Sequence, residues 1–473
     1  MISVSIIGGG FCGCMIAIQL ARQAKEAGQG ILIRVFDKGA NPGRGIAYKT
    51  YSDKHLLNVS AGNMSAFPDE MNHFVEWLKD HSGLPASEVS NVKFYPRNLY
   101  GDYLNSLLEN ELLRNDENVK IELIRDEVID LKINNGKLTL TCKKGTNQAC
   151  DFLVLASGNQ LPSEIRTTDG IVDPALTRYS GNPWEESCVS GLDPDKNIMI
   201  AGTGLTMIDA VIGIHEKGFK GIIYAVSPKG FLMLPHRKKQ EFPEFENEIR
   251  PPYELSDLFR TFRKHVKKAQ SEGISAIGLV DSLRKHTQEI WRKLSVQEKR
   301  RFMRHLRHLW GVARHRLPQD QHEFIEQLIQ DGKLKVIAGR IRNVTNSDKE
   351  IIITLRQRFT QAEMLLPVQR LINCTGPETN PVKFKSAFFI NLLEKKVILC
   401  DEMNMGLQTV SGGMLVTKES LKGRIFATGS LLKGSLWEST AVPELRTQAK
   451  DTAKSILTKV LSQHKSADFS AGR

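Results

Sequence analysis

The chain has 473 residues, of which 41% are apolar and 25% are charged, as in an ordinary soluble protein with two or three domains. It contains no apolar run of about 18 residues and no secretory signal pattern, so neither a membrane span nor export is expected, and the cytoplasm is the expected location. Seven scattered cysteines without a C-x-x-C pair argue against a disulfide framework, a simple dithiol reductase and a simple zinc site.

The first predicted unit lies at the N-terminus. An apolar, β-branched run at residues 2–7 is followed by three glycines in G-x-G-x-x-G spacing: Gly8, Gly10 and Gly13. A helix pattern comes next, and the following strand pattern ends at Asp37. Such glycines let backbone N–H groups approach a pyrophosphate, and the acid accepts hydrogen bonds from a ribose hydroxyl. The unit predicts dinucleotide binding; the alternative is a glycine-rich turn in another α/β protein.

Two further stretches follow before the next unit. Residues 43–68 are too long and too rich in glycine for a simple connector. Arg97 begins a helix pattern after Pro96, and it is equally suited to pair with a cofactor phosphate or with a carboxylate of its own domain.

A second unit of the same kind begins at residue 197. Its strand pattern leads into Gly202 and Gly204, but Met207 stands where the third glycine is expected. The next strand pattern ends in Ser227 and Lys229 rather than in an acid, and these residues suit a 2′-phosphate that an acid would repel. If the unit holds a nicotinamide cofactor, NADP(H) is predicted, with NADH as the alternative. A solvated basic turn is the other interpretation.

The blocks that follow the two units also repeat. Each is a strand, a hairpin with a polar turn and an apolar strand that closes in a glycine turn, at Gly158 in the first block and at Gly376 in the second. This pairing indicates two nucleotide-binding lobes, in which the two glycine turns pass beside the dinucleotides. The predicted fold class is therefore α/β, with two Rossmann-like lobes.

Most of the net charge of +12 lies in residues 256–318, which contain 16 Lys or Arg and five Asp or Glu. Apolar residues at helical spacing predict helices with basic outer faces. Three interpretations stay open: a face that meets cofactor phosphates or an acidic substrate, a merely solvated face, or a surface for nucleic acid or an anionic membrane. Three histidines fall here, but no set of acids or cysteines completes a metal site, so no metal is predicted: His305, His308 and His315.

Taken together, the chain resembles the superfamily of flavoproteins with two dinucleotide-binding domains, and more closely the bacterial FAD/NAD(P)-binding protein family of the YdhS-like group. The resemblance covers nearly the whole chain, through GGGFCG, GIAYKT, LLNVSAGNMSAFP, FYPRNLYGDYL, GTGLTMIDA, SPKGFLMLPH, RHLWGVARHR, INCTGP and LWESTAVPELRTQA. It implies FAD at the first glycine turn and a nicotinamide cofactor at the second, and it supplies no substrate. The implied domains are a discontinuous FAD-binding domain, 1–190 and 371–473, and an inserted NAD(P)-binding domain, 191–370, with a helical insertion at about 238–330.

The resemblance also implies cofactor contacts outside the glycine turns. It places residues 43–68 across the flavin, and the contacts expected from the N-terminal part are Lys38, Asn58, Met64, Ser65 and Arg97. Met64 alternatively fills the core. The last strand pattern ends beside the flavin at Gly429 and Ser430, although many relatives carry an aspartate where Ser430 stands.

The turn that follows is expected to close on the flavin ring. Ala441, Val442 and Pro443 would form the first turn of a helix, whose free N–H groups stabilise negative charge on the reduced flavin. Trp437 and Glu438 would then lie at the mouth of the flavin pocket and are the candidate catalytic residues. The alternative is that Trp437 is a core residue and Glu438 a solvated loop charge.

The leading functional prediction is an FAD-dependent, NAD(P)H-consuming oxidoreductase that passes hydride from the nicotinamide to the flavin. The superfamily suggests a monooxygenase acting on a small, anionic substrate. The alternative is a regulatory or scaffold protein that holds flavin with little turnover and docks a partner through its basic helices. A nucleic-acid partner is not expected, and the sequence does not determine the oligomeric state.

Overall fold

The structure is a computed structural model that describes residues 1–39, 42–114, 116–134, 136–237, 242–347 and 349–471. Its internal contacts divide the chain into two compact units. Unit 1 comprises Met1–Lys49, Val59–Gln160 and Thr379–Arg473, and unit 2 comprises Thr50–Asn58 and Leu161–Glu378. The assignment of a particular dinucleotide to each unit remains a prediction.

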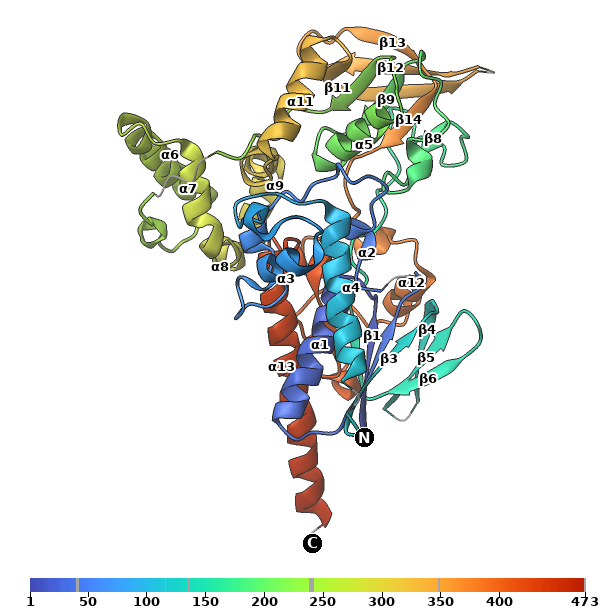
Figure 1. Ribbon diagram of the computed structural model, residues 1–473, viewed down its shortest axis with the longest axis vertical. Helices are drawn as coiled ribbons and strands as arrows, with labels where there is room; N and C mark the ends of the chain where they lie inside the picture. Colours follow the sequence, from blue (N-terminus) through green and yellow to red (C-terminus); the bar gives the residue numbers. More distant parts are fainter. Residues whose placement is uncertain (40–41, 115, 135, 238–241, 348, 472–473) are drawn as a thin grey trace. The chain divides into compact units, whose positions relative to one another are not determined.

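Unit 1 is built on a parallel sheet in the order β15-β7-β1-β2-β3 (Figure 1). Its strands are β1 (Ile2–Ile7), β2 (Ile31–Phe36), β3 (Val119–Ile124), β7 (Phe152–Leu155) and β15 (Ile425–Ala427). The four residues of β7 are all buried, as expected for a sheet covered on both faces. Its helices are α1 (Phe11–Glu26), α2 (Gly45–Tyr48), α3 (His73–His81), α4 (Arg97–Leu113), α12 (Ala387–Glu394) and α13 (Val442–Ala471).

A second, antiparallel sheet completes unit 1 with β4 (Val128–Asn134), β5 (Lys137–Cys142) and β6 (Asn147–Cys150). Helix α12 packs against it through the buried side chains of Phe388 and Leu392, which share one core cluster with Leu131 and Leu140. The side-chain amide of Asn391 also donates a 3.0 Å hydrogen bond to the backbone oxygen of Ile129.

Unit 2 contains a seven-stranded sheet in the order β13-β12-β11-β10-β9-β14-β8. Its strands are β8 (Tyr179–Ser180), β9 (Ile198–Ala201), β10 (Ile223–Ser227), β11 (Leu334–Asn346), β12 (Ile351–Gln357), β13 (Glu363–Val368) and β14 (Arg370–Asn373). The strands from β11 to β8 are parallel, and β11, β12 and β13 form an antiparallel extension. Helices α5 (Leu205–Glu216) and α11 (Gln319–Gln330) share a core with β9 and β10.

The chain between β10 and β11 carries the basic segment as a series of helices: α6 (Leu255–Ser271), α7 (Ala276–Leu283), α8 (Thr287–Lys293), α9 (Val296–His305) and α10 (Arg307–Arg314). Its N-terminal part has a small core of its own, formed by Phe242, Phe245, Ala269 and Leu279. The expected α/β fold with paired parallel sheets and a helical insertion is confirmed. No helix among the described residues combines the length and apolar character that crossing a membrane requires.

Candidate dinucleotide-binding sites

The first glycine turn joins β1 to α1 and tolerates no side chain at two of its glycines. Gly8 has a φ of +110°, and a Cβ atom there would lie 2.3 Å from the carbonyl oxygen of Ala156. A Cβ atom at Gly13 would lie 1.8 Å from the carbonyl oxygen of Gly8. Both distances are far below van der Waals contact, so glycine is required by packing, and α1 starts close behind the turn as a phosphate site needs.

Asp37 follows β2 and binds the glycine turn through one carboxylate oxygen and its own loop through the other. Oδ2 accepts a 2.7 Å hydrogen bond from the N–H of Gly9, and Oδ1 accepts a 2.6 Å hydrogen bond from the N–H of Gly39. The carboxylate therefore lies beside the glycine turn, and its contact with a ribose remains a prediction. Lys38 points away into solvent, with 78% of its side chain exposed and its Nζ 3.8 Å from Glu127 Oε1.

The second glycine turn, between β9 and α5, repeats the geometry of the first. Gly202 has a φ of +117°, and a Cβ atom there would lie 2.1 Å from the carbonyl oxygen of Cys374. Gly204 faces open space, as does Gly376 with its φ of +95°. Met207, which replaces the third glycine, is fully buried in the core of unit 2. The second unit thus keeps the turn and the open room beside it.

The strand neighbours repeat as well. In unit 1, β7 pairs with β1 and carries Ala156 against Gly8, and in unit 2, β14 pairs with β9 and carries Cys374 against Gly202. The duplication inferred from sequence is therefore present in the three-dimensional arrangement of both units.

The end of β10 supplies the candidate 2′-phosphate site. The Ser227 Oγ accepts a 3.0 Å hydrogen bond from the N–H of Gly230 and lies 2.9 Å from Thr203 Oγ1, which donates to the Phe231 carbonyl oxygen at 2.6 Å. Ser227 therefore orders the loop that carries Lys229. Sequence reasoning did not identify Thr203, although its place inside the glycine turn is a usable signal.

Two residues of the basic segment join Lys229. Arg307 Nη2 lies 3.2 Å from His308 Nε2, and burial, Arg307 and Lys229 together lower the pKa of His308. His308 is therefore mainly neutral at pH 7. An anion bound near it would raise the pKa of His308 and favour its protonated form. This proximity was not predictable from the sequence, because it depends on how the helical insertion returns to the sheet.

Three predicted contacts meet where β15 ends. Gly429 has a φ of +69°, and a Cβ atom there would lie 3.1 Å from Cys12 Sγ in the first glycine turn. The N–H of Gly429 donates to Gln448 Oε1 at 3.2 Å, and the Ser430 hydroxyl donates to the Gly158 carbonyl oxygen at 2.8 Å. Burial is the main cause that raises the pKa of Cys12 to about 12, so its thiol is neutral and acts as a packing group.

Helix α13 begins at Val442, directly after the turn predicted to close on the flavin. Ala441 already accepts the first helical hydrogen bonds, from the N–H groups of Glu444 at 3.1 Å and Leu445 at 2.9 Å. The N–H groups of the first turn have no helical partner and form the positive end of the helix. Their proximity to a flavin ring remains a prediction.

Trp437 and Glu438 are both buried, with 6% and 8% of their surface exposed. The alternative interpretation of Glu438 as a solvated loop charge is wrong, because the turn folds its carboxylate inward at a φ of +68°. Lys433 Nζ lies 5.6 Å from the centroid of the Trp437 ring. The hydroxyl of Ser439 is fully buried and has no hydrogen-bond partner among the described residues, which fits a polar ligand beside this turn.

The remaining predicted flavin contacts are divided between the units. Asn58 belongs to unit 2, where its backbone oxygen lies 3.0 Å from His236 Nε2. Met64 and Ser65 belong to unit 1 and are buried, and the Ser65 hydroxyl donates to the Glu70 backbone oxygen at 2.7 Å. Arg97 is half-buried at the start of α4.

Part of the basic segment has a structural role. Arg316 is buried and donates from Nη1 and Nη2 to the two carboxylate oxygens of Asp281, each at 2.9 Å. This bidentate pair fixes the end of the insertion to α7. A cluster of metal-ligand types not considered from sequence also lies here, with His286 Nε2 3.4 Å from Glu244 Oε2 and 3.5 Å from Glu246 Oε1. The Lys285 ammonium pairs with Glu244 and supplies positive charge there.

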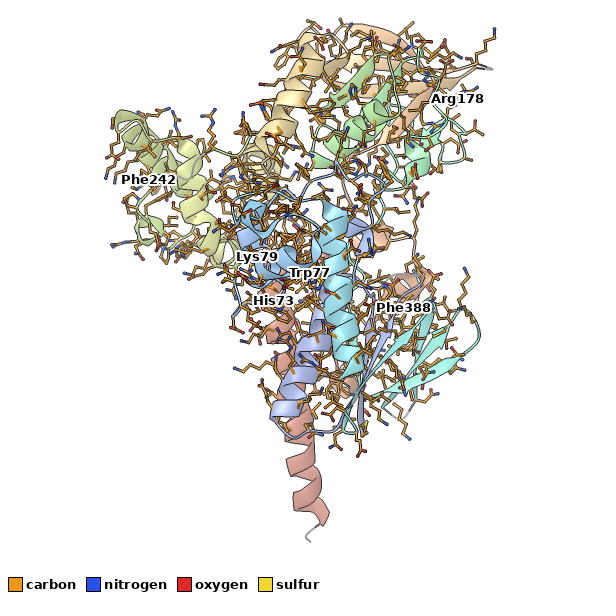
Figure 2. All side chains as sticks on the ribbon, viewed as in Figure 1. His73, Trp77, Lys79, Arg178, Phe242 and Phe388 are labelled. Carbon is orange, nitrogen blue, oxygen red and sulfur yellow. The ribbon has the colours of Figure 1, made fainter. Side chains whose placement is uncertain are left out.

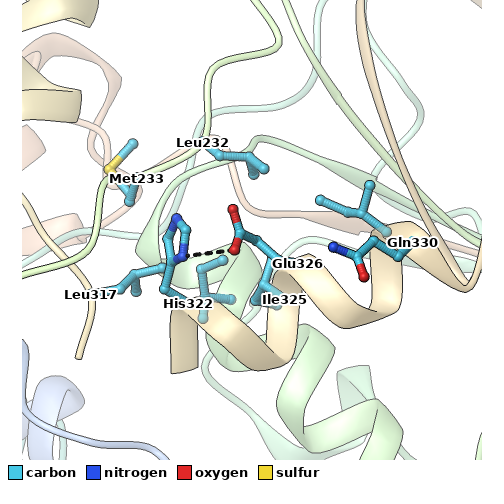
Figure 3. A pocket seen from close by; sticks show the side chains of 9 residues that line it. Leu232, Met233, Leu317, His322, Ile325, Glu326 and Gln330 are labelled. Carbon is cyan, nitrogen blue, oxygen red and sulfur yellow. Dashed lines mark ion pairs between the residues drawn. The ribbon is translucent and has the colours of Figure 1, made fainter. Parts of the chain in front are cut away.

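A pocket of about 210 Å³ lies between α5, α11 and the segment after β10 (Figure 3). Its walls are mainly apolar, with Leu232 and Met233 on one side and Ile325 on the other, and His322 Nδ1 lies 3.5 Å from Glu326 Oε2 at its edge. The volume is below that of sites for drug-sized ligands, so the pocket does not accommodate a dinucleotide.

Comparisons with known proteins agree with this geometry. Residues 5–160 match the family model described as FAD-NAD(P)-binding. No curated protein sequence matches the chain. The solved structure of the reduced ornithine hydroxylase PvdA from Pseudomonas aeruginosa is 16% identical, with a TM-score of 0.67 over 97% of this chain and 100% of that chain.

Two other solved structures extend the comparison. The ornithine N-hydroxylase KtzI from Kutzneria sp. 744, with reduced FAD, NADP+ and L-ornithine, is 14% identical, with a TM-score of 0.61 over 96% of this chain and 99% of that chain. The bacillithiol disulfide reductase Bdr from Bacillus cereus is 12% identical, with a TM-score of 0.53 over 97% of this chain and 99% of that chain.

The chain therefore has the fold of the flavoproteins with two dinucleotide-binding domains. The match of residues 5–160 to the FAD-NAD(P)-binding model lies within this fold. Membership in the YdhS-like group remains a prediction.

Proposed function

We propose that this protein is an FAD-dependent oxidoreductase that consumes NAD(P)H. The observation that carries the proposal is the repeated steric requirement at Gly8 and Gly202, each pressed against a carbonyl oxygen of the neighbouring strand's turn. Two turns of this geometry, one in each unit, suit two dinucleotides. The family match at residues 5–160 supports FAD at the first turn.

Unit 1 offers a consistent set of groups for FAD. The turn from Gly8 to Gly13 and the N-terminus of α1 suit the pyrophosphate, and Asp37 suits the adenosine ribose. Gly158 and Ser430, joined by a hydrogen bond, would lie along the flavin side of the cofactor. The N-terminus of α13 would stabilise negative charge at the flavin pyrimidine edge.

Unit 2 offers the matching set for the nicotinamide cofactor. Gly204 and Gly376 leave open room beside the N-terminus of α5 for a pyrophosphate, and Gly202 sets the turn before it. Lys229, on the loop ordered by Ser227, would bind the 2′-phosphate of NADP(H). When bound, FAD would take electrons from NAD(P)H and pass them to dioxygen or to an organic acceptor.

The monooxygenase subclass is the further part of the proposal. Two of the similar solved structures are ornithine hydroxylases, and they align over almost their full length. The chain contains no C-x-x-C pair, and burial raises the pKa of Cys12 and Cys14, so a dithiol relay like that of a disulfide reductase has little support. The buried Trp437 and Glu438 would contact a small-molecule substrate beside the flavin.

The test is anaerobic mixing of the FAD-loaded protein with NADPH, followed by exposure to air. We expect the flavin absorbance to bleach and then to return as oxygen is consumed. The alternative function, a flavin-holding scaffold, predicts a full content of FAD that neither NADPH nor NADH bleaches within a turnover time.

A further inference from the structure

A continuous set of aromatic rings crosses unit 1 from the first glycine turn to the surface. The Tyr100 ring lies 6.5 Å from Phe11, which follows Gly10 directly, and 5.4 Å from the ring of Tyr103. Tyr103 in turn lies 5.5 Å from Trp77, measured between ring centroids. Trp77 is half-buried on α3 and stacks on the exposed His81, with ring centroids 4.8 Å apart and an interplanar angle of 3°. Figure 2 labels Trp77 and His73.

Two members of this set carry polar atoms that packing alone does not need. The Tyr100 hydroxyl and the Trp77 Nε1 are buried, and neither has a hydrogen-bond partner among the described residues. Leaving such a group unsatisfied is unfavourable, and a phenylalanine at either place would avoid that cost. The chemistry that Tyr and Trp have and Phe lacks is easy one-electron oxidation.

Tyr103 has the partner that oxidation of a phenol requires. Its oxygen accepts a 3.3 Å hydrogen bond from the N–H of Ala66 and lies 2.9 Å from His73 Nδ1, which accepts the phenolic proton in the tautomer that carries its own proton on Nε2. Burial is the main cause that lowers the pKa of His73, with Arg22 lowering it further and Glu70 opposing this. Burial also raises the pKa of Tyr103. The pair at neutral pH is therefore a neutral phenol and a neutral imidazole.

We propose that Tyr103 and His73 form a proton-coupled electron donor, connected by Tyr100 to the cofactor turn and by Trp77 to solvent, which removes oxidising equivalents from the cofactor site. The oxidant is the hydroxyl radical, which forms together with hydroxide when hydrogen peroxide takes one electron from a reduced transition-metal ion in solution. Flavin-dependent reduction of oxygen releases the peroxide, so the physiological role rests on the proposed function. The oxidant gains one electron from Tyr103, and the phenolic proton moves to His73 Nδ1.

The donor is then restored from the surface. A soluble reductant of the thiolate or ascorbate class at the surface gives one electron to the Tyr103 radical through the Trp77 ring, and the proton returns from His73 to the Tyr103 oxygen. In sum, one electron passes from the reductant to the oxidant, and the protein is unchanged.

Pulse radiolysis of the full chain tests the connection without relying on catalysis. Azidyl radicals oxidise tryptophan, and we expect the indolyl absorbance to convert into phenoxyl absorbance at a first-order rate that is independent of protein concentration. Trp77→Phe and Tyr103→Phe should each lose most of this conversion. Tyr95→Phe is the matched control, because Tyr95 is also a buried tyrosine of unit 1, with its hydroxyl bonded to the N–H of Ser90 at 3.0 Å.

The role of His73 has its own readout. In the unmodified chain, the conversion should slow as the pH falls below the pKa of His73, because an imidazolium cannot accept the phenolic proton; His73→Gln should be slow at every pH. Thermal unfolding establishes that each variant is folded, and mass spectrometry of the peroxide-treated unmodified chain should find oxidation concentrated at Trp77 and Tyr103. Unchanged conversion in Tyr103→Phe, or oxidation spread evenly over the exposed aromatic residues, would overturn the proposal. Both results are independent of the ability of NADPH to reduce the flavin.

Discussion

At the scale of the residue, Gly8 and Gly202 are the positions where the two turns most clearly require glycine. Each has a positive φ, and each faces a carbonyl oxygen closer than any Cβ atom can approach. A side chain at either glycine must therefore displace the backbone of the neighbouring strand's turn. Because the two turns lie in different units, the consequences of the two substitutions should be separable.

We expect Gly8→Ala to lose FAD, and Gly202→Ala to keep FAD while losing its reduction by NAD(P)H. Flavin content after purification and the rate of anaerobic bleaching measure the two effects. Gly311→Ala is the control, since Gly311 lies within a helix with open space around it, and alanine is favoured there by about 0.5–1 kcal/mol. Equal loss of FAD in both turn variants would contradict the division of roles.

Lys229 should determine the preference between the two nicotinamide cofactors. A charge-assisted phosphate contact contributes roughly 1.5–3 kcal/mol, so Lys229→Glu should reduce the preference for NADPH by about tenfold or more. The control is Lys220→Glu. Lys220 is an exposed lysine that precedes the start of β10, whereas Lys229 follows its end. Equal bleaching rates with NADPH and NADH in the unmodified protein would refute this assignment.

His308 adds a pH dependence to the same site. Its pKa is lowered in the free protein, so it is largely neutral near pH 7, and a bound phosphate would raise that pKa and draw in a proton. The affinity for NADPH should therefore increase as the pH falls, by up to about tenfold per pH unit, whereas that for NADH should not. Titrations with His308→Gln isolate this contribution; an identical pH profile in that variant would exclude it.

At the scale of the element, the turn before α13 combines an unusual backbone conformation with buried polar groups. A glutamate at positive φ, a buried tryptophan and a buried serine hydroxyl occur in succession just before the positive end of a helix. A non-glycine residue held at positive φ costs of order 1 kcal/mol or more, which is more common at functional sites than elsewhere.

We expect Trp437→Ala and Glu438→Gln to change flavin reduction or substrate turnover more than they change FAD content. Pro443→Gly should weaken FAD retention modestly by loosening the turn. Flavin stoichiometry and stopped-flow rates, measured on the same preparations, distinguish the two effects. If the FAD content falls in proportion to the rate of flavin reduction, the turn serves only to hold FAD and has no role in the reaction.

Local patterns determined what could be predicted from the sequence. The glycine turns, their strands and Asp37 were predictable because strand, turn and helix follow one another within about 30 residues. The burial of Glu438, the pairing of Arg316 with Asp281 and the approach of His308 to Lys229 were not, because each depends on contacts between distant segments. The same holds for residues 50–58, which belong to unit 2 although they lie within the N-terminal part of the chain.

At the scale of the whole molecule, the net charge of +12 gives little reason to expect nucleic-acid binding. Some of the basic groups are used internally, as Arg316 is with Asp281 and Arg301 is with Glu298 at 2.9 Å. The insertion also has its own apolar core, so its helices are folded without a nucleic acid. We expect only weak binding of duplex DNA at physiological salt, measured by fluorescence anisotropy; tight binding with a steep salt dependence would reverse this view.

The central claim is that electrons pass from a nicotinamide cofactor in one unit to FAD in the other. Stopped-flow mixing of the FAD-loaded chain with NADPH or NADH without oxygen tests it most directly. We predict complete bleaching of the flavin, faster with NADPH than with NADH, and no bleaching in Gly202→Ala at equal flavin content. A stoichiometrically FAD-loaded, folded protein whose flavin is bleached by neither cofactor would contradict the account.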